Sequence, residues 1–328
     1  MRNHHSRTIN WRRKVKKLSS RLSEAKREFT RYRDPKVSKL IAKEIIDLKK
    51  DIAWMLLDCG EYRKAIALYK EMPWRSEGET KYLGIGRALT EVGDDAEAEK
   101  LLAKGLKRFP KSAPLLVGMG NIYHRAEDYI TSLRFFERAL SIDQTNNLIH
   151  FSKANALYGI GHYEDAYSIY RILTINDPDE PLFLMQFGYC CLQLNYPEDA
   201  AKCFKSLMDG GFSDSNAYNG LFWAYYDMGL ENEAIETAVR GIKKCSDSDL
   251  YTDLGLAYYE QGWLQEARDT VREGLGKFPK DKDLIEILET IEDDIDDPDD
   301  DNKRKILEMV RLVALSAILR TIKKNRRV

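Results

Sequence analysis

A small residue recurs along this chain at an almost constant interval, and that interval constrains the fold more than any local motif. The residue is alanine in six cases and serine in one, and neighbouring members are 33 or 34 residues apart. The seven positions are Ala65, Ala98, Ser132, Ala166, Ala200, Ala234 and Ala267. A fixed period of this length is typical of arrays in which each structural unit stacks on the next. We therefore expect one elongated repeat array rather than separate globular domains.

The residues around each small residue predict a pair of short helices. Five residues earlier a glycine is common, where a chain leaving one helix needs a left-handed conformation. These glycines are Gly60, Gly93, Gly161, Gly229 and Gly262. A large apolar residue such as Phe136 or Phe204 follows the small residue by four positions, one helical turn along the same face. Pro110, Pro178 and Pro279 are expected to end second helices, because proline cannot continue a helix.

The last repeat shows these features together, with Val271 in place of the usual aromatic residue. Its residues are Tyr251, Leu254-Gly255, Tyr258, Ala267, Val271 and Pro279. In this pattern the chain resembles the tetratricopeptide repeat (TPR) family, over about seven repeats within residues 46–281. The resemblance implies an all-α, right-handed superhelical solenoid of helix-turn-helix units with extra helices at both ends. It also implies a scaffold that binds a partner protein or an extended peptide.

The sequence divides into five expected segments. Residues 1–35 form a basic amphipathic helix, 36–281 the TPR solenoid and 282–292 a capping helix, followed by an acidic linker over 293–302 and a C-terminal helix over 303–328. The first helix could cap the first repeat or occupy a groove on a partner. The last helix is apolar between basic flanks but too short to cross a bilayer, which takes about 20 residues. It could lie in a membrane interface, bind a partner or fold back on the repeats.

Charge is segregated along the chain although the formal net charge is only −1. Residues 1–50 carry +12, residues 51–280 carry −10, residues 281–301 carry −11 and residues 302–328 carry +8. The basic ends could therefore recruit the chain to an anionic membrane surface, as a peripheral contact. The candidate residues are Arg12, Arg13, Lys14, Lys16, Lys17, Lys323, Lys324, Arg326 and Arg327. Nucleic acid is disfavoured, because the acidic body would repel phosphate.

The first helix of each pair should line the concave face of the solenoid, where a partner would bind. Counting from the repeated Leu-Gly step, the predicted groove residues are Arg87, Asn121, His124, Phe151, Asn155, Tyr158, Tyr189, Trp223, Tyr226 and Tyr259. The amides can hold a peptide backbone, and the aromatic rings can form apolar pockets. The alternative is that several of these aromatic residues pack between repeats.

No catalytic, cofactor or metal site is expected. The five histidines lack an acidic partner or a nucleophile at a recognisable spacing, and the five cysteines show no metal-binding spacing. The cysteines are odd in number and scattered, which suits a reducing compartment. The first residues lack the apolar core of a secretory signal. The sequence thus predicts a non-enzymatic cytoplasmic adaptor, with an organelle transit peptide as a less favoured alternative.

Overall fold

The computed structural model describes residues 2–32, 34–73, 78–212 and 214–296, and within these residues it contains sixteen helices and no strand. The predicted all-α fold is confirmed. The chain divides into two compact units, Met1–Ala156 and Leu157–Val328. The expected linker beyond residue 296 and the expected C-terminal helix lie outside the described residues.

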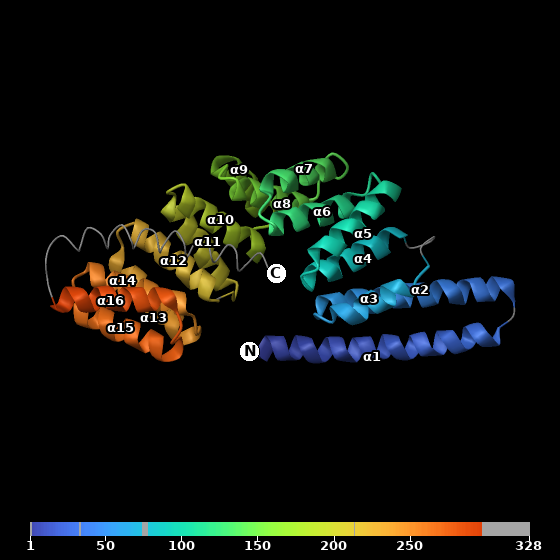
Figure 1. Ribbon diagram of the computed structural model, residues 1–328, viewed down its shortest axis with the longest axis horizontal. Coiled ribbons are helices and arrows are strands. Elements are labelled where there is room, and N and C mark those ends of the chain that lie inside the picture. The colour runs from blue at the N-terminus through green and yellow to red at the C-terminus, as the bar shows by residue number, and fades with distance from the viewer. Residues whose placement is uncertain (1, 33, 74–77, 213, 297–328) are drawn as a thin grey trace. The chain divides into compact units, whose positions relative to one another are not determined.

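The first unit is built from long N-terminal helices followed by shorter ones (Figure 1). Its helices are α1 (Arg2–Arg31), α2 (Pro35–Asp58), α3 (Tyr62–Lys70), α4 (Gly78–Glu91), α5 (Asp95–Arg108), α6 (Ala113–Arg125), α7 (Tyr129–Leu140) and most of α8 (Asn147–Gly159), in which the division falls. A core of buried apolar side chains runs from α1 to α6 and includes Leu22, Leu56, Tyr69 and Leu102.

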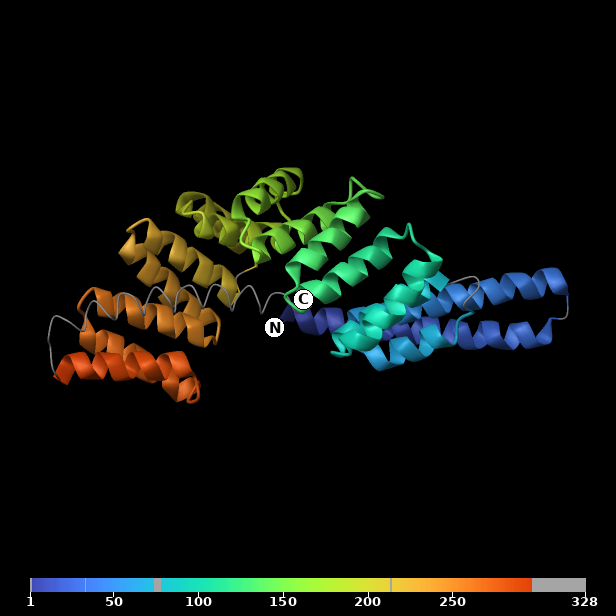
Figure 2. The same ribbon diagram turned by 45° about the horizontal axis from the view of Figure 1, so that its top comes forward.

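The second unit continues the same alternation. Its helices after α8 are α9 (Tyr163–Asn176), α10 (Pro181–Gln193), α11 (Pro197–Asp209), α12 (Ser215–Asp227), α13 (Glu231–Lys244), α14 (Ser248–Glu260), α15 (Leu264–Lys277) and α16 (Lys282–Asp296). The orange and red helices of residues 248–296 lie side by side in both views (Figures 1 and 2). Their shared core contains Tyr251, Val271, Leu284 and Ile287.

From α2 to α15 the helices follow one another as seven successive pairs, and α1 and α16 are additional. All seven recurrent small residues lie on second helices and are fully buried. The predicted helix ends are also confirmed, because α5, α9 and α15 each stop within two residues of Pro110, Pro178 and Pro279. The period of the sequence is therefore the period of the fold, an all-α repeat solenoid.

The turn inside each pair uses a left-handed residue. The five predicted glycines have φ between 70° and 84°. Where the glycine is missing, the backbone keeps this conformation, with φ of 60° at Glu127 and 58° at Asn195. Since residues with a Cβ rarely adopt positive φ, the packing of the two helices fixes the turn more strongly than the local sequence does.

The large residue of each second helix occupies space that a glycine leaves on a first helix. A Cβ on Gly188 would lie 2.8 Å from Phe204, and a Cβ on Gly220 would lie 2.2 Å from the same ring. Phe204 is fully buried between the two. Gly188 belongs to the same pair as Phe204 and Gly220 to the next, so one ring packs both within a repeat and between repeats.

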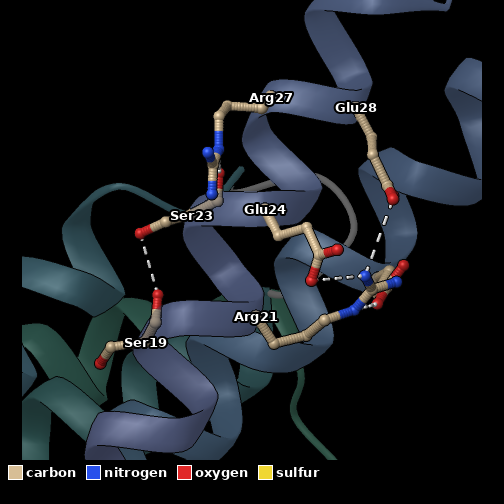
Figure 3. A network of polar contacts seen from close by, with 7 residues as sticks. Ser19, Arg21, Ser23, Glu24, Arg27 and Glu28 are labelled. Atoms are coloured by element: carbon tan, nitrogen blue, oxygen red, sulfur yellow. Dashed lines mark hydrogen bonds and ion pairs between the residues drawn. The ribbon is translucent and has the colours of Figure 1, made fainter.

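The first helix, α1, lies antiparallel to α2 in both views (Figures 1 and 2). Leu22 and Ala25 of α1 are buried, while Arg21 forms ion pairs with Glu24, Glu28 and, across to α2, Glu44 at 2.7 Å (Figure 3). These contacts attach the basic helix to the first helix pair. The helix α1 thus covers the apolar surface at that end of the array, which agrees with the alternative that it caps the first repeat.

At the other end, α16 packs on α14 and α15 and buries Leu284, Ile287 and Ile291. The helix continues to Asp296, beyond the expected end at residue 292. Ile291 and Ile295 contribute to its apolar core, which accounts for the extra turn. Among the described helices none is both long enough and apolar enough to span a membrane.

Candidate functional site

The predicted groove residues lie on the first helices of the pairs. Within the first unit α2 contacts α4 and α4 contacts α6, and within the second unit α10, α12, α14 and α16 contact one another in order. Each unit thus has a continuous surface of first helices. We call the surface made by α10, α12 and α14 the first-helix wall of the second unit.

In the first unit, Arg87 is exposed and held by the preceding repeat. Its Nη2 lies 3.2 Å from Oδ1 of Asp58, and its guanidinium carbon lies 5.3 Å from the ring centre of Trp54. Both partners belong to α2, whereas Arg87 belongs to α4. An exposed ion pair of this kind adds little stability, so the guanidinium can exchange its partner at small cost.

The other predicted residues of the first unit are polar or only partly exposed. Asn121 is exposed on α6. His124 is half-buried, with its ring edge-on to Tyr129 at 5.2 Å between centres. Phe151 and Asn155 of α8 are also half-buried. Only Arg87 and Asn121 therefore lie open to solvent among the predicted residues of this unit.

In the second unit the predicted aromatic residues are buried or half-buried. Tyr189 is fully buried, and Tyr158, Trp223 and Tyr259 are each less than a tenth exposed, while Tyr226 is half-buried. The indole of Trp223 is edge-on to Tyr226 at 5.4 Å between ring centres. Tyr158 packs on Tyr163 and Tyr189 packs on Phe204, with ring centres 4.9 and 5.2 Å apart, so these rings lie inside the helix packing, as the alternative interpretation of the aromatic residues expects.

Hydrogen bonds join each first helix of the second unit to the next. The Tyr189 hydroxyl donates to the backbone oxygen of Asn216 at 3.0 Å, and Asn219 Nδ2 donates to Asp253 Oδ2 at 2.5 Å. The Tyr226 hydroxyl donates to Glu260, and the Tyr259 hydroxyl donates to Asp294. The last three pairs are 34 or 35 residues apart, which is one repeat. We call these four bonds the inter-repeat ladder.

Three acceptors of the ladder are acids, of which Asp253 and Asp294 are buried and Glu260 is half-buried. Asp253 is 1% exposed, and burial raises the pKa of its carboxyl well above the ordinary value, with nearby Asp249 adding to the effect. Burial also raises the pKa of Glu260. Within the described residues none of Asp253, Glu260 and Asp294 forms an ion pair with a cation. Their hydrogen-bond donors are neutral, and burial favours the protonated, uncharged form of Asp253 and Glu260.

The helices of the first-helix wall carry acidic residues but no basic ones. Helices α10, α12 and α14 contain no Lys, Arg or His, and their charged residues are Asp227, Asp249, Asp253 and Glu260. A surface that combines aromatic rings with acidic residues and no basic ones favours apolar and cationic groups over anionic ones.

The comparisons with known proteins agree with the repeat geometry. The family model for the tetratricopeptide repeat matches residues 113–146, which span the pair α6 and α7. The chain therefore contains a tetratricopeptide repeat at these residues. The TPR repeat-containing protein YpiA of Bacillus subtilis (strain 168) is 24% identical over 202 residues, covering 60% of this chain and 47% of YpiA. The chain thus spans about half the length of this curated relative.

Solved structures share the TPR fold at low sequence identity. A chain of the APC/C hetero-tetramer Cut9–Hcn1 is similar with a TM-score of 0.62 and 16% identity, over 77% of this chain and 51% of that one. A tetratricopeptide repeat protein from Parabacteroides merdae ATCC 43184 has a TM-score of 0.56 and 13% identity, over 74% of this chain and 97% of its own. At these identities the likeness establishes the fold alone.

The basic candidates fall into two groups. Arg12, Arg13, Lys14, Lys16 and Lys17 are all exposed on α1. The C-terminal candidates Lys323, Lys324, Arg326 and Arg327 lie outside the described residues. An exposed row of five cations on the TPR protein's first helix is available to an anionic surface.

Three of the five cysteines pack inside the protein, whereas Cys59 and Cys245 are half-buried. Cys190, Cys191 and Cys203 are buried, and burial raises the pKa of Cys190 and of Cys203 to about 12. These thiols stay protonated at neutral pH, which makes them poor nucleophiles and poor metal ligands. They fill space between helices, as their sequence setting predicts.

Sequence reasoning did not assign the acids of the inter-repeat ladder to the site. Asp253, Glu260 and Asp294 resemble ordinary surface carboxylates, because charged residues are usually exposed. The available signal was the separation of 34 residues between Tyr226 and Glu260, which places donor and acceptor on equivalent helices of adjacent TPR units. Whether the ten predicted groove residues bind a partner stays a prediction.

Proposed function

We propose that this protein is a non-enzymatic interaction scaffold that binds a partner protein or an extended peptide on the concave surface of its TPR helices. The observation that carries the proposal is the first-helix wall of the second unit. It combines aromatic rings and acidic residues with a complete lack of basic residues on α10, α12 and α14. Such a surface offers apolar contact and charge selection but no acid, base or nucleophile arranged for catalysis.

The chemistry of the wall defines the partner that fits it. A segment with apolar side chains and Lys or Arg at intervals would pack on the rings and bring a cation to the exposed Asp227 or the half-buried Glu260. In the first unit, the exposed amide of Asn121 and the guanidinium of Arg87 would offer hydrogen bonds to a partner of their own. The similar chain of the Cut9–Hcn1 hetero-tetramer is itself part of a protein assembly, which supports a role of this class.

A peptide library displayed on phage and selected against the full chain tests this proposal. We expect enrichment of peptides that combine apolar residues with Lys or Arg. Trp223→Ala should weaken a peptide that binds the second unit by about tenfold, the effect of losing a central contact, and Asn121→Ala should do the same for a peptide that binds the first unit. Trp263→Ala is the matched control, because this tryptophan is 45% exposed and lies at the start of a second helix. Retained binding in Trp223→Ala with native circular dichroism would refute the concave site.

A second candidate function is recruitment to an anionic membrane surface by the basic terminal segments. The five exposed cations of α1 favour it. Co-sedimentation with phosphatidylglycerol vesicles should fall as salt rises, because exposed charges are screened over about 8 Å at physiological ionic strength. Replacing Arg12, Arg13, Lys14, Lys16 and Lys17 by Gln should reduce binding. A separate variant replaces the C-terminal residues by Gln and measures how much of the vesicle binding depends on them. These residues are Lys323, Lys324, Arg326 and Arg327. If neither variant binds less than the unmodified chain, this function is rejected.

A further inference from the structure

The turn between α1 and α2 exposes large apolar side chains. Phe29 is 43% exposed, Tyr32 is 49%, Val37 is 36% and Leu40 is 69%. All four lie within twelve residues that enclose the turn, two before it and two after it. We call these four residues the hairpin tip. Single exposed apolar residues are ordinary, but a cluster at one end of a helical hairpin marks an interaction surface.

The hairpin tip is surrounded by cations. Lys26, Arg27, Arg31, Lys36 and Lys39 are exposed on α1 and α2. Residues 26–43 contain seven basic residues and two acidic ones. One of the two acids, Glu28, faces Arg21 at 3.7 Å, and the other, Asp34, caps α2. The charge left around the tip is therefore strongly positive.

The hairpin tip is held in place by local bonds. Asp34 accepts hydrogen bonds from the backbone nitrogens of Lys36 and Val37 at 2.8 and 3.2 Å, and Pro35 begins α2. The Ser38 hydroxyl donates to the backbone oxygen of Tyr32 at 3.0 Å, across the turn. The tip can therefore meet a partner without first becoming ordered, which lowers the entropic cost of binding.

The protein's own core does not cover this end of the hairpin. In α2 the first buried residue is Ile41, and the remaining buried residues begin at Lys49. Helices α3 and α4 contact α2, and in both views they lie beside its later part, so the turn between α1 and α2 extends beyond them (Figures 1 and 2). The tip is thus open to another surface.

We propose that the hairpin tip inserts into the interface of an anionic phospholipid bilayer, with Phe29, Tyr32, Val37 and Leu40 among the upper acyl chains and the surrounding cations at the phosphates. Aromatic and aliphatic side chains ringed by Lys and Arg have the chemistry of a peripheral membrane anchor. An acidic protein surface would use the cations but would leave Leu40 without an apolar environment. The inference rests on the membrane recruitment proposed above and assigns the apolar part of that contact.

Vesicle binding separates insertion from charge attraction alone. The full chain carrying Lys323→Gln, Lys324→Gln, Arg326→Gln and Arg327→Gln serves as the background, so that the C-terminal charges do not dominate. We expect it to co-sediment with vesicles of phosphatidylcholine and phosphatidylglycerol but not with phosphatidylcholine alone. Adding Phe29→Ser and Leu40→Ser should weaken binding by about tenfold or more without changing the net charge.

The matched control replaces exposed apolar residues elsewhere. Ile172 and Ile175 of α9 are 59% and 68% exposed, and Asp177, Asp179 and Glu180 follow them. Ile172→Ser with Ile175→Ser should leave vesicle binding unchanged. Because all four substituted side chains are exposed, the variants should retain the circular dichroism of the unmodified chain.

Depth of insertion is measured by fluorescence quenching with brominated lipid. Leu40→Trp should be quenched by anionic vesicles that contain bromine in the acyl chains, whereas Ile175→Trp should not. The variant with Phe29→Ser and Leu40→Ser could bind vesicles as well as the background protein does, with binding still weakened by salt. That result would show that the hairpin tip does not insert. The proposed membrane recruitment by charge would still hold. If the background binds no anionic vesicle, or binds a DNA duplex equally well, both inferences fail.

Discussion

Two residues occupy a backbone conformation that side chains usually avoid. Glu127 and Asn195 have positive φ at the turn position where five other repeats carry glycine. Asparagine tolerates this region, but glutamate is held there against a preference of about 1 kcal/mol. The helix pairs thus impose the turn on whichever residue is present.

Glu127→Gly should therefore stabilise the first unit, by about 1 kcal/mol, because glycine adopts positive φ without strain. The reverse change at an equivalent turn, Gly161→Ala, should destabilise by a similar amount. Urea unfolding followed by circular dichroism measures both variants. A loss of stability in Glu127→Gly would show that the glutamate side chain contributes more than its backbone conformation costs.

The buried carboxyl of Asp253 should give the protein a distinctive dependence on pH. Its raised pKa means that the folded protein keeps this proton to higher pH than the unfolded chain does. The free energy of unfolding should then fall as pH rises from the unfolded carboxyl's range through the folded pKa. Asp253→Asn cannot titrate and can still accept the bond from Asn219.

We expect the advantage of Asp253→Asn over the unmodified protein to grow as pH rises towards neutral, reaching a few degrees in Tm. Thermal melts at a series of pH values from about 4 to 8 measure this difference. The matched change Asp209→Asn, at an exposed position of α11, should show no such trend. A constant difference between the Asp253 variant and the unmodified protein would contradict a buried, titrating carboxyl.

Helix elements approach one another most closely where glycine faces a large side chain. A methyl group on Gly220 would lie 2.2 Å from the buried ring of Phe204. Gly220→Ala should therefore destabilise the second unit by about 1–3 kcal/mol through overpacking. Gly276→Ala, with nothing within 4 Å of the added carbon, should be neutral or slightly stabilising. Equal melting temperatures for the two variants would mean that α11 and α12 adjust freely.

The elements were predictable because each one repeats a short chemical pattern. A buried alanine, a glycine turn and a terminal proline act locally, so the sequence alone was enough to place the helix pairs and their ends. The inter-repeat ladder was harder, because donor and acceptor are separated by a whole repeat and the acids look like surface residues. The burial of Tyr189 and Trp223 was left open for the same reason, since side-chain accessibility depends on what packs against a helix and not on its own spacing.

At the level of the whole molecule, a repeat array gains stability mainly from contacts between neighbouring units. Ile287→Asp places a charge at a 2% exposed position in α16 and should cost on the order of 4 kcal/mol or more. Hydrogen exchange should then lose protection in α14, α15 and α16, with the first unit's helices still protected. Ile285→Asp, at a 39% exposed position of the same helix, is the control. Loss of protection throughout the chain would contradict local coupling.

The inter-repeat ladder also has a direction. In all four bonds the donor belongs to the earlier helix and the acceptor to the later one. The repeats are therefore joined head to tail, and the four hydrogen bonds depend on the order of the repeats. If α12 with α13 exchanged places with α14 with α15, the Tyr189 hydroxyl would meet the start of α14, Asn219 would be separated from Asp253, and Tyr226 would face α16 in place of Glu260. A duplicated unit could extend this array only by bringing its own carboxylate for the tyrosine before it.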